Sequence, residues 1–314
     1  MSDHETLILT RSDVENLVRM DDAIETMEEA FRAQGLGQAR NLTQNFALDS
    51  GTVSIKAGFL PGIARVGLKS LGLVVLCQAG QLRRPLAILE QAPITYLRTG
   101  AAGALAAKYL ARRDCRTVGV VGTGRQARAQ VDALSRLFRL SRVRAWSPTP
   151  AHREQYAGEM SVALGVPVGP AAGPKEAVEG QDLVITATRA TGPVIEGGWV
   201  SPGTHVNAIG ADMPGSQELP GDLLKSAEVY ADEIEQALWT GAVNVPVAQG
   251  LFRREDFRGN LGQVISGKVP GRSGPTAITV FDCSGLGMMD VALAQRVYER
   301  ALSSPNFRRV DWFA

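Results

Sequence analysis

The sequence predicts an α/β protein with a doubly wound, mostly parallel sheet and a second, mixed α+β domain. From Thr117 onward, apolar runs of strand length alternate with stretches long enough for a helix or a turn. A glycine-rich turn joins the first of these runs to a helical segment. Before Thr117 the pattern differs, because helical spacing is followed there by short strand-like pieces.

Length and composition indicate a folded protein. The 314 residues allow one large or two ordinary domains, and 45% of them are hydrophobic and 21% charged. A net charge of +1 gives no global attraction to nucleic acid or to an anionic membrane. No apolar run approaches the roughly 20 residues of a membrane helix. The N-terminus lacks the basic and apolar regions of a signal peptide, so we expect a cytoplasmic protein. The widely spaced Cys77, Cys115 and Cys283 predict neither disulfides nor a metal site.

The first domain is expected to begin with a short apolar run, ETLILT, and a helical region. Ser12 and Glu15 form a capping-box pattern at the start of that helical spacing. Three strand-like pieces follow, at 41–48, 52–60 and 66–76. The alanine-rich stretch from Thr99 to Arg112 then predicts a tightly packed helix.

The second domain is expected to contain the parallel sheet. Its strand-length runs are 118–121, 143–146, 183–187, 205–209 and 229–231. A last strand in AITVFDC precedes a Ser-Gly-Leu-Gly turn and a helix that begins at about Asp290. We therefore assign 116–289 to this domain. The first domain would comprise 1–115 and the C-terminal helix at 290–314.

The segment Gly122-x-Gly124-x-x-Ala127 follows an apolar strand and opens a helix. Gly122 permits a tight turn, Gly124 lets a pyrophosphate approach the backbone, and Ala127 allows the helix and strand to pack closely. The free N–H groups at the helix start bind the anion. This context predicts a Rossmann-type dinucleotide-binding domain, with a chance glycine-rich turn on a flavodoxin-like sheet as the alternative.

The end of the next strand favours NADP(H) over NAD(H). An NAD site usually has an acid there that binds the adenosine ribose. Here the chain reads WSPTPAHRE, so Ser147 and Thr149 occupy that region, with Arg153 and Arg125 nearby. Hydroxyls and cations suit a 2′-phosphate better than they suit a bare ribose. Arg153 could equally be a solvated helix residue, and NAD(H) is the alternative cofactor.

Four charged residues outside the turn are candidates for the chemistry. Arg40 and Arg98 have the planar fork that pairs with both oxygens of a carboxylate. Lys69 lies in a mostly apolar strand, where it needs an anion or a lowered pKa. Asp212 follows a strand, at the end where α/β sheets bind ligands. Taken singly, each of the four also fits an ordinary salt bridge or turn.

Together these segments resemble the ornithine cyclodeaminase and mu-crystallin family. VGLKS looks like the family's Gly-x-Lys segment, and YLRTGAAGALAAKYLAR resembles its helix entry. VVGTGRQA is similar to its nucleotide turn, and GTHVNAIGADMPGSQEL to its Gly-x-Asp-x-Pro-Gly segment. GRSGPTAITVFDCSGLGMMD is similar to its C-terminal strand and turn. The motifs follow the family's order over most of the chain.

The resemblance implies an amino- or imino-acid enzyme that uses a nicotinamide cofactor and forms homodimers through its first domain. By similarity, Arg40 and Arg98 hold the substrate carboxylate beside Lys69, and Asp212 is the acid/base at the substrate nitrogen. Lys69 and Asp212 would be the catalytic residues. The residues expected at the cofactor are Thr99, Gly122, Gly124, Arg125, Gln126, Ala127, Ser147, Thr149, Arg153, Thr186, Ala187, Thr188, Ser284 and Gly285.

Departures from the cyclodeaminase pattern argue against ornithine as the substrate. Cyclodeaminases use an acid near the segment VSIKAG for the distal ammonium, and the matching position here is Ser54. Lys56 would repel that ammonium by on the order of 1 kcal/mol or more. We therefore expect a ketimine reductase acting on cyclic imines or an alanine-type dehydrogenase, with an L-amino acid as product. Lys56 could bind a second substrate carboxylate or simply be an exposed strand residue.

Two alternatives remain open. One is a redox-neutral ornithine cyclodeaminase with bound NAD. The other is a crystallin-like protein that binds NADPH or a small ligand without turnover. The presence of Arg40, Lys69, Arg98 and Asp212 argues against the binding protein, because it has no need of a proton donor at a substrate nitrogen.

Overall fold

The computed structural model describes residues 5–49, 51–304 and 306–311, which divide into two compact units. The first unit is built from the chain up to Arg98 and from Leu286 onward, and the second from Thr99 to Gly285. The sequence predicts the joins at 115–116 and 289–290, so both lie earlier in the chain than expected. The first join falls inside a continuous helix, so no break in secondary structure marks it.

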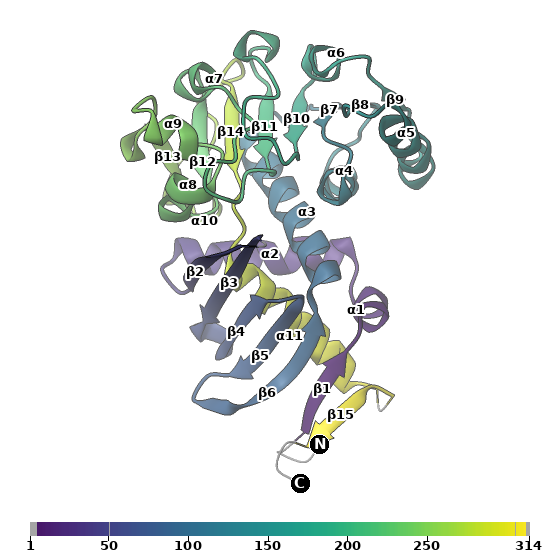
Figure 1. The fold of residues 1–314 in the computed structure, drawn as a ribbon, viewed down its shortest axis with the longest axis vertical. Coiled ribbons are helices and arrows are strands. Elements are labelled where there is room, and N and C mark those ends of the chain that lie inside the picture. The colour runs from purple at the N-terminus through teal and green to yellow at the C-terminus, as the bar shows by residue number, and fades with distance from the viewer. Residues whose placement is uncertain (1–4, 50, 305, 312–314) are drawn as a thin grey trace. The chain divides into compact units, whose positions relative to one another are not determined.

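The first unit contains a seven-stranded mixed sheet in the order β15-β1-β6-β5-β4-β3-β2 (Figure 1). Its strands are β1 (Glu5–Leu9), β2 (Arg40–Leu48), β3 (Gly51–Leu60), β4 (Arg65–Ser70), β5 (Leu73–Gln78), β6 (Gln81–Glu90) and β15 (Arg308–Asp311). Its helices are α1 (Arg11–Leu17), α2 (Met20–Gly35), η1 (Pro61–Ile63), the start of α3 (Gln91–Leu110) and α11 (Gly287–Leu302). β1 pairs in parallel with β6, whereas the other neighbouring strands are antiparallel.

Two expectations for this unit need correction. The piece expected at 66–76 is two strands, because Leu71 (φ +50°) and Gly72 (φ +87°) form a two-residue hairpin turn. The helix expected at 290–314 ends at Leu302, and β15 then pairs with β1. Pairing with a strand from the other end of the chain leaves no local sequence signal.

Helix α11 packs directly against β3 because both partners lack side chains at the contact. A Cβ on Gly58 would lie 2.3 Å from the backbone nitrogen of Met288, and a Cβ on Gly287 would meet the β3 backbone at 2.2 Å. The Met288 N–H donates to Oδ1 of Asn41 at 2.9 Å. These contacts fix the N-terminal turn of α11, which carries Asp290, on the sheet.

The second unit contains the doubly wound sheet that the sequence predicts. Its eight strands are parallel, in the order β13-β12-β14-β11-β10-β7-β8-β9 (Figure 1). They are β7 (Thr117–Val121), β8 (Arg142–Trp146), β9 (Val168–Pro170), β10 (Leu183–Thr186), β11 (His205–Ala208), β12 (Glu228–Ala231), β13 (Phe257–Asn260) and β14 (Thr279–Asp282). The strand order reverses between β7 and β10, and ligands bind parallel sheets at the carboxyl side of such a point.

Short and medium helices connect these strands. They are α4 (Arg125–Leu137), α5 (Pro150–Leu164), α6 (Pro174–Val178), η2 (Gly197–Trp199), α7 (Gly221–Ser226), α8 (Ile234–Thr240), α9 (Asn244–Ala248), η3 (Arg254–Asp256) and α10 (Leu261–Ile265). Across the described parts of both units, no helix combines the length and the apolar character needed to cross a membrane.

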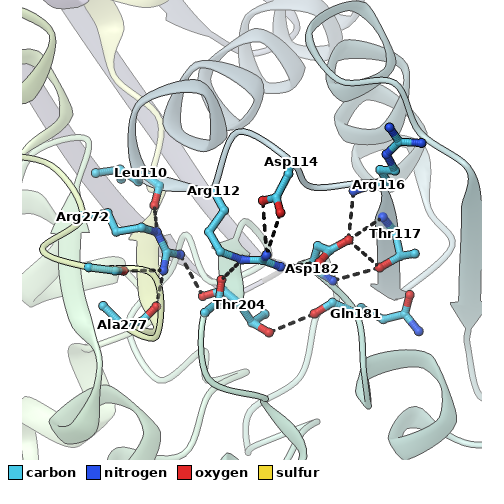
Figure 2. A network of polar contacts seen from close by, with 12 residues as sticks. Leu110, Arg112, Asp114, Arg116, Thr117, Gln181, Asp182, Thr204, Arg272 and Ala277 are labelled. Atoms are coloured by element: carbon cyan, nitrogen blue, oxygen red, sulfur yellow. Dashed lines mark hydrogen bonds and ion pairs between the residues drawn. The ribbon is translucent and has the colours of Figure 1, made fainter.

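A polar network fixes the amino ends of the strands in the second unit (Figure 2). Asp182, just before β10, accepts hydrogen bonds from the backbone N–H and the hydroxyl of Thr117 at 3.0 and 2.9 Å, and it pairs with Arg112. Arg272 donates to the carbonyl of Leu110 at 2.8 Å and to the hydroxyl of Thr279 at 3.1 Å. Because these contacts lie at the amino edge, they leave the opposite, carboxyl edge for ligands.

Candidate active site

The glycine-rich turn lies between β7 and α4, at the carboxyl end of the parallel sheet. Gly122 has a φ of +99°, and a Cβ there would lie 2.4 Å from the carbonyl oxygen of Ala187. Gly124 caps α4 without a side-chain hydrogen bond, and a Cβ there would meet no heavy atom within 4 Å. The backbone N–H groups at the start of α4 are therefore accessible, which fits a pyrophosphate.

The side chains of this turn differ in burial. Arg125 is exposed, whereas Ala127 is fully buried, as close packing of the helix and strand requires. Oε1 of Gln126 is buried and has no hydrogen-bond partner in the described structure. An unsatisfied buried oxygen beside an open backbone turn fits a ligand with hydrogen-bond donors.

The region after β8, where the sequence lacks the ribose acid, is built from main chain and one arginine. Ser147 is buried, and its hydroxyl donates to the carbonyl of Thr149 at 3.3 Å. Arg153 donates to the carbonyls of Ser147 and Ala172 at 3.4 and 3.5 Å. These contacts are long, so the guanidinium is held near the strand end without a strong ionic partner among them.

A buried carboxylate ties together the ends of β10 and β11. Glu218 accepts hydrogen bonds from the Thr186 hydroxyl at 2.9 Å, the Thr188 N–H at 2.6 Å and the Gly210 N–H at 2.8 Å. Burial raises the pKa of Glu218, against the effect of these donors. The exposed Asp212 lies two residues beyond Gly210, so Glu218 fixes the base of the loop that carries the predicted acid/base.

Two further buried acids lie at the ends of β12 and β14. Asp232 accepts a hydrogen bond from the Ser284 hydroxyl at 2.8 Å and another from the Gly285 N–H at 2.5 Å. Asp282 accepts from the N–H groups of Ala242 and Val243 at 2.9 and 3.3 Å. Burial raises the pKa of Asp282 to about 8. The segment expected at the nicotinamide is therefore held by carboxylates and not by its own turn alone.

Thr99 was expected at the cofactor, and the structure gives it a second role. Its carbonyl accepts a hydrogen bond of 2.7 Å from Nε2 of Gln130, on α4. Oε1 of Gln130 accepts from Asn207 at 3.1 Å, and a Cβ on Gly103 would lie 1.9 Å from the same oxygen. This buried polar contact packs α3 against α4.

In the first unit, one carboxylate joins two of the predicted substrate-binding cations. Nε of Arg98, on α3, lies 3.2 Å from Oδ1 of Asp290, and Nζ of Lys69, on β4, lies 3.3 Å from Oδ2. The side chains of Lys69, Arg98 and Asp290 are 11%, 5% and 1% exposed. Lys69 also donates to the Thr95 hydroxyl at 3.5 Å. The group is thus a nearly dry cluster with two cations on one anion.

The surroundings of Lys69 in this cluster give it a low pKa for a lysine. Burial, and then the charges of Arg98 and Lys56, lower the pKa of Lys69 to about 7, although Asp290 opposes the shift. Burial alone would raise the pKa of Asp290, but Lys69, Arg98 and Lys56 outweigh it and hold that pKa below its usual value. Asp290 is therefore ionised at neutral pH, while the charge of Lys69 responds to small changes around it.

The strand register shows which other candidates share this face of the sheet. Lys56, on β3, lies directly opposite Lys69, and Ser54, two residues before Lys56, lies on the same face. Arg40, on β2, pairs with Phe59 and is exposed. Because successive residues point to opposite faces, Arg40 faces away from Lys56 and Lys69. The structure of this unit does not bring Arg40 into the cluster, and its predicted contact with the substrate stays untested.

The sequence interpretation missed the acids that hold these segments. Asp290 served there only to mark the start of a helix, and Glu218, Asp232 and Asp282 were not singled out. A signal did exist for two of them, because Asp232 and Asp282 each lie at the end of a short apolar strand. An acid at that position has to be satisfied by neighbouring loops, and in a parallel sheet those loops bind ligands.

Comparisons with known proteins find similar sequences and similar folds. Residues 57–305 match the model of the ornithine cyclodeaminase/mu-crystallin family. Alanine dehydrogenase from Archaeoglobus fulgidus is 36% identical over 98% of this chain and 99% of that protein. A solved archaeal alanine dehydrogenase dimer with bound NAD has a TM-score of 0.93 at 36% identity, and covers 98% of this chain and 100% of its own. The Thermococcus litoralis Δ1-pyrroline-2-carboxylate reductase, solved with NADH and L-proline, has a TM-score of 0.93 at 30% identity, over 97% and 100% of the two chains.

Proposed function

The chain belongs to the ornithine cyclodeaminase/mu-crystallin family, and we propose that it reduces an imino acid to an L-amino acid with NAD(P)H, or catalyses the reverse oxidation. The observation that carries the proposal is the Lys69–Asp290–Arg98 cluster, in a chain that also has an open dinucleotide turn. Relatives that are named as a dehydrogenase of alanine and a reductase of a cyclic imino acid support it.

The first unit supplies the substrate carboxylate site. Lys69 and Arg98 share the single carboxylate of Asp290, and Lys56 lies across the strand pair from Lys69. Like charges directly opposite one another destabilise a sheet, so a bound anion would relieve the repulsion between these lysines. A carboxylate suits this role because the planar guanidinium of Arg98 can pair with both its oxygens.

The second unit holds the dinucleotide and the proton donor. The nicotinamide, when bound, supplies or accepts the hydride. The turn at Gly122 and Gly124 binds the pyrophosphate through backbone N–H groups. Asp212 protonates the imine nitrogen or holds its proton, which makes the imine carbon a better hydride acceptor. Glu218 keeps the strand ends that carry Thr186 and Asp212 at a fixed spacing.

For the cofactor, we favour NADP(H) over NAD(H). Ser147 stands where a ribose-binding acid is usual, so no carboxylate repels a 2′-phosphate at this strand end. Among the described residues, Arg153 makes two long hydrogen bonds to carbonyls there, which leave its guanidinium available to an anion. The solved relatives contain NAD or NADH, so the preference has to be measured for this chain.

The assembly we propose is a homodimer through the first unit. The face of its sheet that points away from α11 carries exposed apolar side chains, which are Leu42, Phe46, Leu48, Leu68 and Leu73. A solvent-facing apolar row of this kind is typical of an interface, and the solved archaeal relative is a dimer.

A cofactor-oxidation assay tests the function. NADPH and NADH are each mixed with the protein and with pyrroline-2-carboxylate, piperideine-2-carboxylate, or pyruvate plus ammonia. Consumption of reduced cofactor with one of these substrates, faster with NADPH, is the expected result. Release of ammonia from ornithine or lysine without net cofactor oxidation would replace the reductase with a cyclodeaminase. Dinucleotide binding without turnover of any substrate would leave a binding protein.

A further inference from the structure

Asp290 lies where three separate elements of the first unit meet. It is in the first turn of α11, and its two oxygens contact Lys69 on β4 and Arg98 on α3. Among the charged neighbours that act on the pKa of Lys69, Asp290 favours the charged form, whereas Arg98 and Lys56 oppose it. Asp290 is therefore the acidic counterpart of a group of cations from α3, β3 and β4.

The backbone around Asp290 is built to hold it there. Gly58 and Gly287 allow α11 to touch β3, and a Cβ on Gly67, in β4, would lie 3.1 Å from a methyl group of Val291 and 2.4 Å from a carbonyl oxygen of β5. The Met288 N–H is fixed by Asn41. Because backbone meets backbone at Gly58 and Gly287, the first turn of α11 is held close to β3, and with it the backbone of Asp290.

We propose that Asp290 is a positioning residue, whose carboxylate orders Lys69 and Arg98 as one carboxylate-binding pair and favours the ammonium form of Lys69. The role of this pair in substrate binding rests on the proposed function, whereas the contacts of Asp290 with Lys69 and Arg98 do not depend on it. Asp290 uses one oxygen for each cation, which leaves the remaining N–H groups of Arg98 and Lys69 for a second anion. The substrate would then bind to a pair whose geometry is set in advance.

If Asp290 had a purely structural role, its substitution would not change the charge of Lys69. Burial, Arg98 and Lys56 all favour the neutral amine, and Asp290 is the group that opposes them. Loss of its negative charge should therefore lower the pKa of Lys69 further. The neutral amine would no longer attract a carboxylate, so substrate affinity would fall at neutral pH while dinucleotide affinity would not.

The test compares Asp290→Asn with the full-length wild-type protein. The titration of Lys69 is followed by NMR of protein labelled with ¹³C at the lysine ε-carbons, and Lys69→Arg identifies its signal. We expect Asp290→Asn to move this titration to lower pH and to reduce kcat/KM for the imino acid by on the order of 10- to 100-fold at pH 7. The KM for the dinucleotide should stay within about twofold.

Asp22→Asn is the matched control, because Asp22 also binds an arginine of α11, Arg300, at 2.8 Å, but at the surface. It should leave the Lys69 titration unchanged. Asp290→Glu keeps the charge and displaces it by one methylene. Its Lys69 titration should therefore lie close to that of the wild type, whereas its kcat/KM should recover less fully from the loss seen in Asp290→Asn. This variant also serves if Asp290→Asn does not fold.

The two failures can be told apart. An unchanged Lys69 titration and unchanged kcat/KM in Asp290→Asn, in a protein that reduces an imino acid, would overturn the role of Asp290 and leave the function standing. A shifted titration in a protein that turns over no amino or imino acid would support Asp290 as the charge partner and overturn the proposed function. If Asp290→Asn is unfolded and Asp290→Glu behaves like the wild type in both measurements, the positioning role is also overturned.

Discussion

The backbone N–H of Gly210 donates a hydrogen bond of 2.8 Å to Oε2 of Glu218, and a side chain on Gly210 would destroy this contact. A Cβ there would lie 2.5 Å from the other oxygen of Glu218 and 2.2 Å from the carbonyl oxygen of Thr188. The carboxylate is completely buried and cannot retreat into solvent. The close approach of β10 and β11 at the ligand-binding edge thus depends on a glycine at this position.

We predict that Gly210→Ala lowers the free energy of unfolding by about 1–3 kcal/mol and weakens dinucleotide binding. The strain acts on the loops that carry Thr188 and Asp212. Urea unfolding and a fluorescence titration with NADPH measure the two effects. Gly158→Ala, on α5, is the control, because a Cβ there meets no atom within 4 Å and alanine favours a helix. Equal dinucleotide affinities in the two variants would contradict the prediction.

Ser147→Asp should reverse the proposed cofactor preference. A carboxylate at the end of β8 would repel a 2′-phosphate and accept hydrogen bonds from the ribose hydroxyls. We expect the ratio of kcat/KM for NADPH to that for NADH to fall by about 10-fold or more, since close like charges cost at least 1 kcal/mol. Ser141→Asp, just before the amino end of the same strand, adds the same charge far from the turn and should leave the ratio unchanged. A wild-type ratio below one would already contradict the premise.

The features that the sequence predicts well are those whose cause is local. The strand, the turn at Gly122 and the following helix occupy one continuous segment, and the turn itself requires a glycine at position 122. The need of Lys69 for a partner anion could also be predicted, because Lys69 is a lysine in a mostly apolar strand. The hairpin after Ser70 was missed for a local reason too, because Leu71 adopts a positive φ that leucine rarely takes.

The features that were missed have causes far away in the chain. The role of Asp290 depends on its contacts with Lys69 and Arg98, which lie far from it in the sequence. Only the packing of α11 on β3 brings these residues together. Arg40 shows the converse. Its residue type suits a carboxylate, but the face it occupies depends on the register of β2 with β3, which a single sequence does not specify.

A glutamate in place of Phe46 should dissociate the proposed homodimer. Phe46 is 49% exposed on the sheet face opposite α11, in a row with Leu42 and Leu68. Burying an unpaired carboxylate in an apolar interface is strongly unfavourable, so we expect Phe46→Glu to be monomeric at micromolar concentration. Light scattering after size-exclusion chromatography measures the mass. Val162→Glu, at a side chain 87% exposed on α5, is the control and should match the wild type. A monomeric wild type would remove the basis of the prediction.

Asp282 should make the protein less stable as the pH rises. Burial, assisted by the charges of Asp232 and Glu218, raises its pKa to about 8 in the folded state, above the ordinary value of the unfolded chain. Its contribution to stability is therefore fully present below the unfolded pKa and is lost as the pH rises through about 8. Asp282→Asn carries no titrating group, so its unfolding free energy should fall less than that of the wild type between those limits.

Chemical denaturation at several pH values measures this difference. Asp256→Asn is the control of opposite sign, because, against the effect of burial, Lys225 and the N–H of Arg253 hold the pKa of Asp256 below its usual value. The stability that Asp256 provides is present above its unfolded pKa and lost as the pH falls through the folded one. Parallel stability curves for the wild type and Asp282→Asn between pH 4 and 8 would show that Asp282 is ionised in the folded protein.

The last prediction concerns the pH dependence of the proposed reaction. Lys69 has a pKa of about 7 in the free protein, lowered by burial and by Arg98 and Lys56. Only its protonated form attracts the substrate carboxylate, so kcat/KM for the imino acid should fall as the pH rises through about 7. The bound carboxylate stabilises the ammonium and raises its pKa, and kcat should therefore begin to fall only at higher pH.

Lys69→Arg distinguishes this fall of kcat/KM from the effect of any other titrating group in the reaction. A guanidinium stays charged throughout the range, so the fall of kcat/KM near pH 7 should vanish even if the overall rate is lower. Profiles of kcat/KM and kcat from pH 5.5 to 9.5, for both proteins, provide the test. Should the same fall of kcat/KM persist in Lys69→Arg, it belongs to a group other than Lys69. Substrate capture would then not depend on the protonation of Lys69.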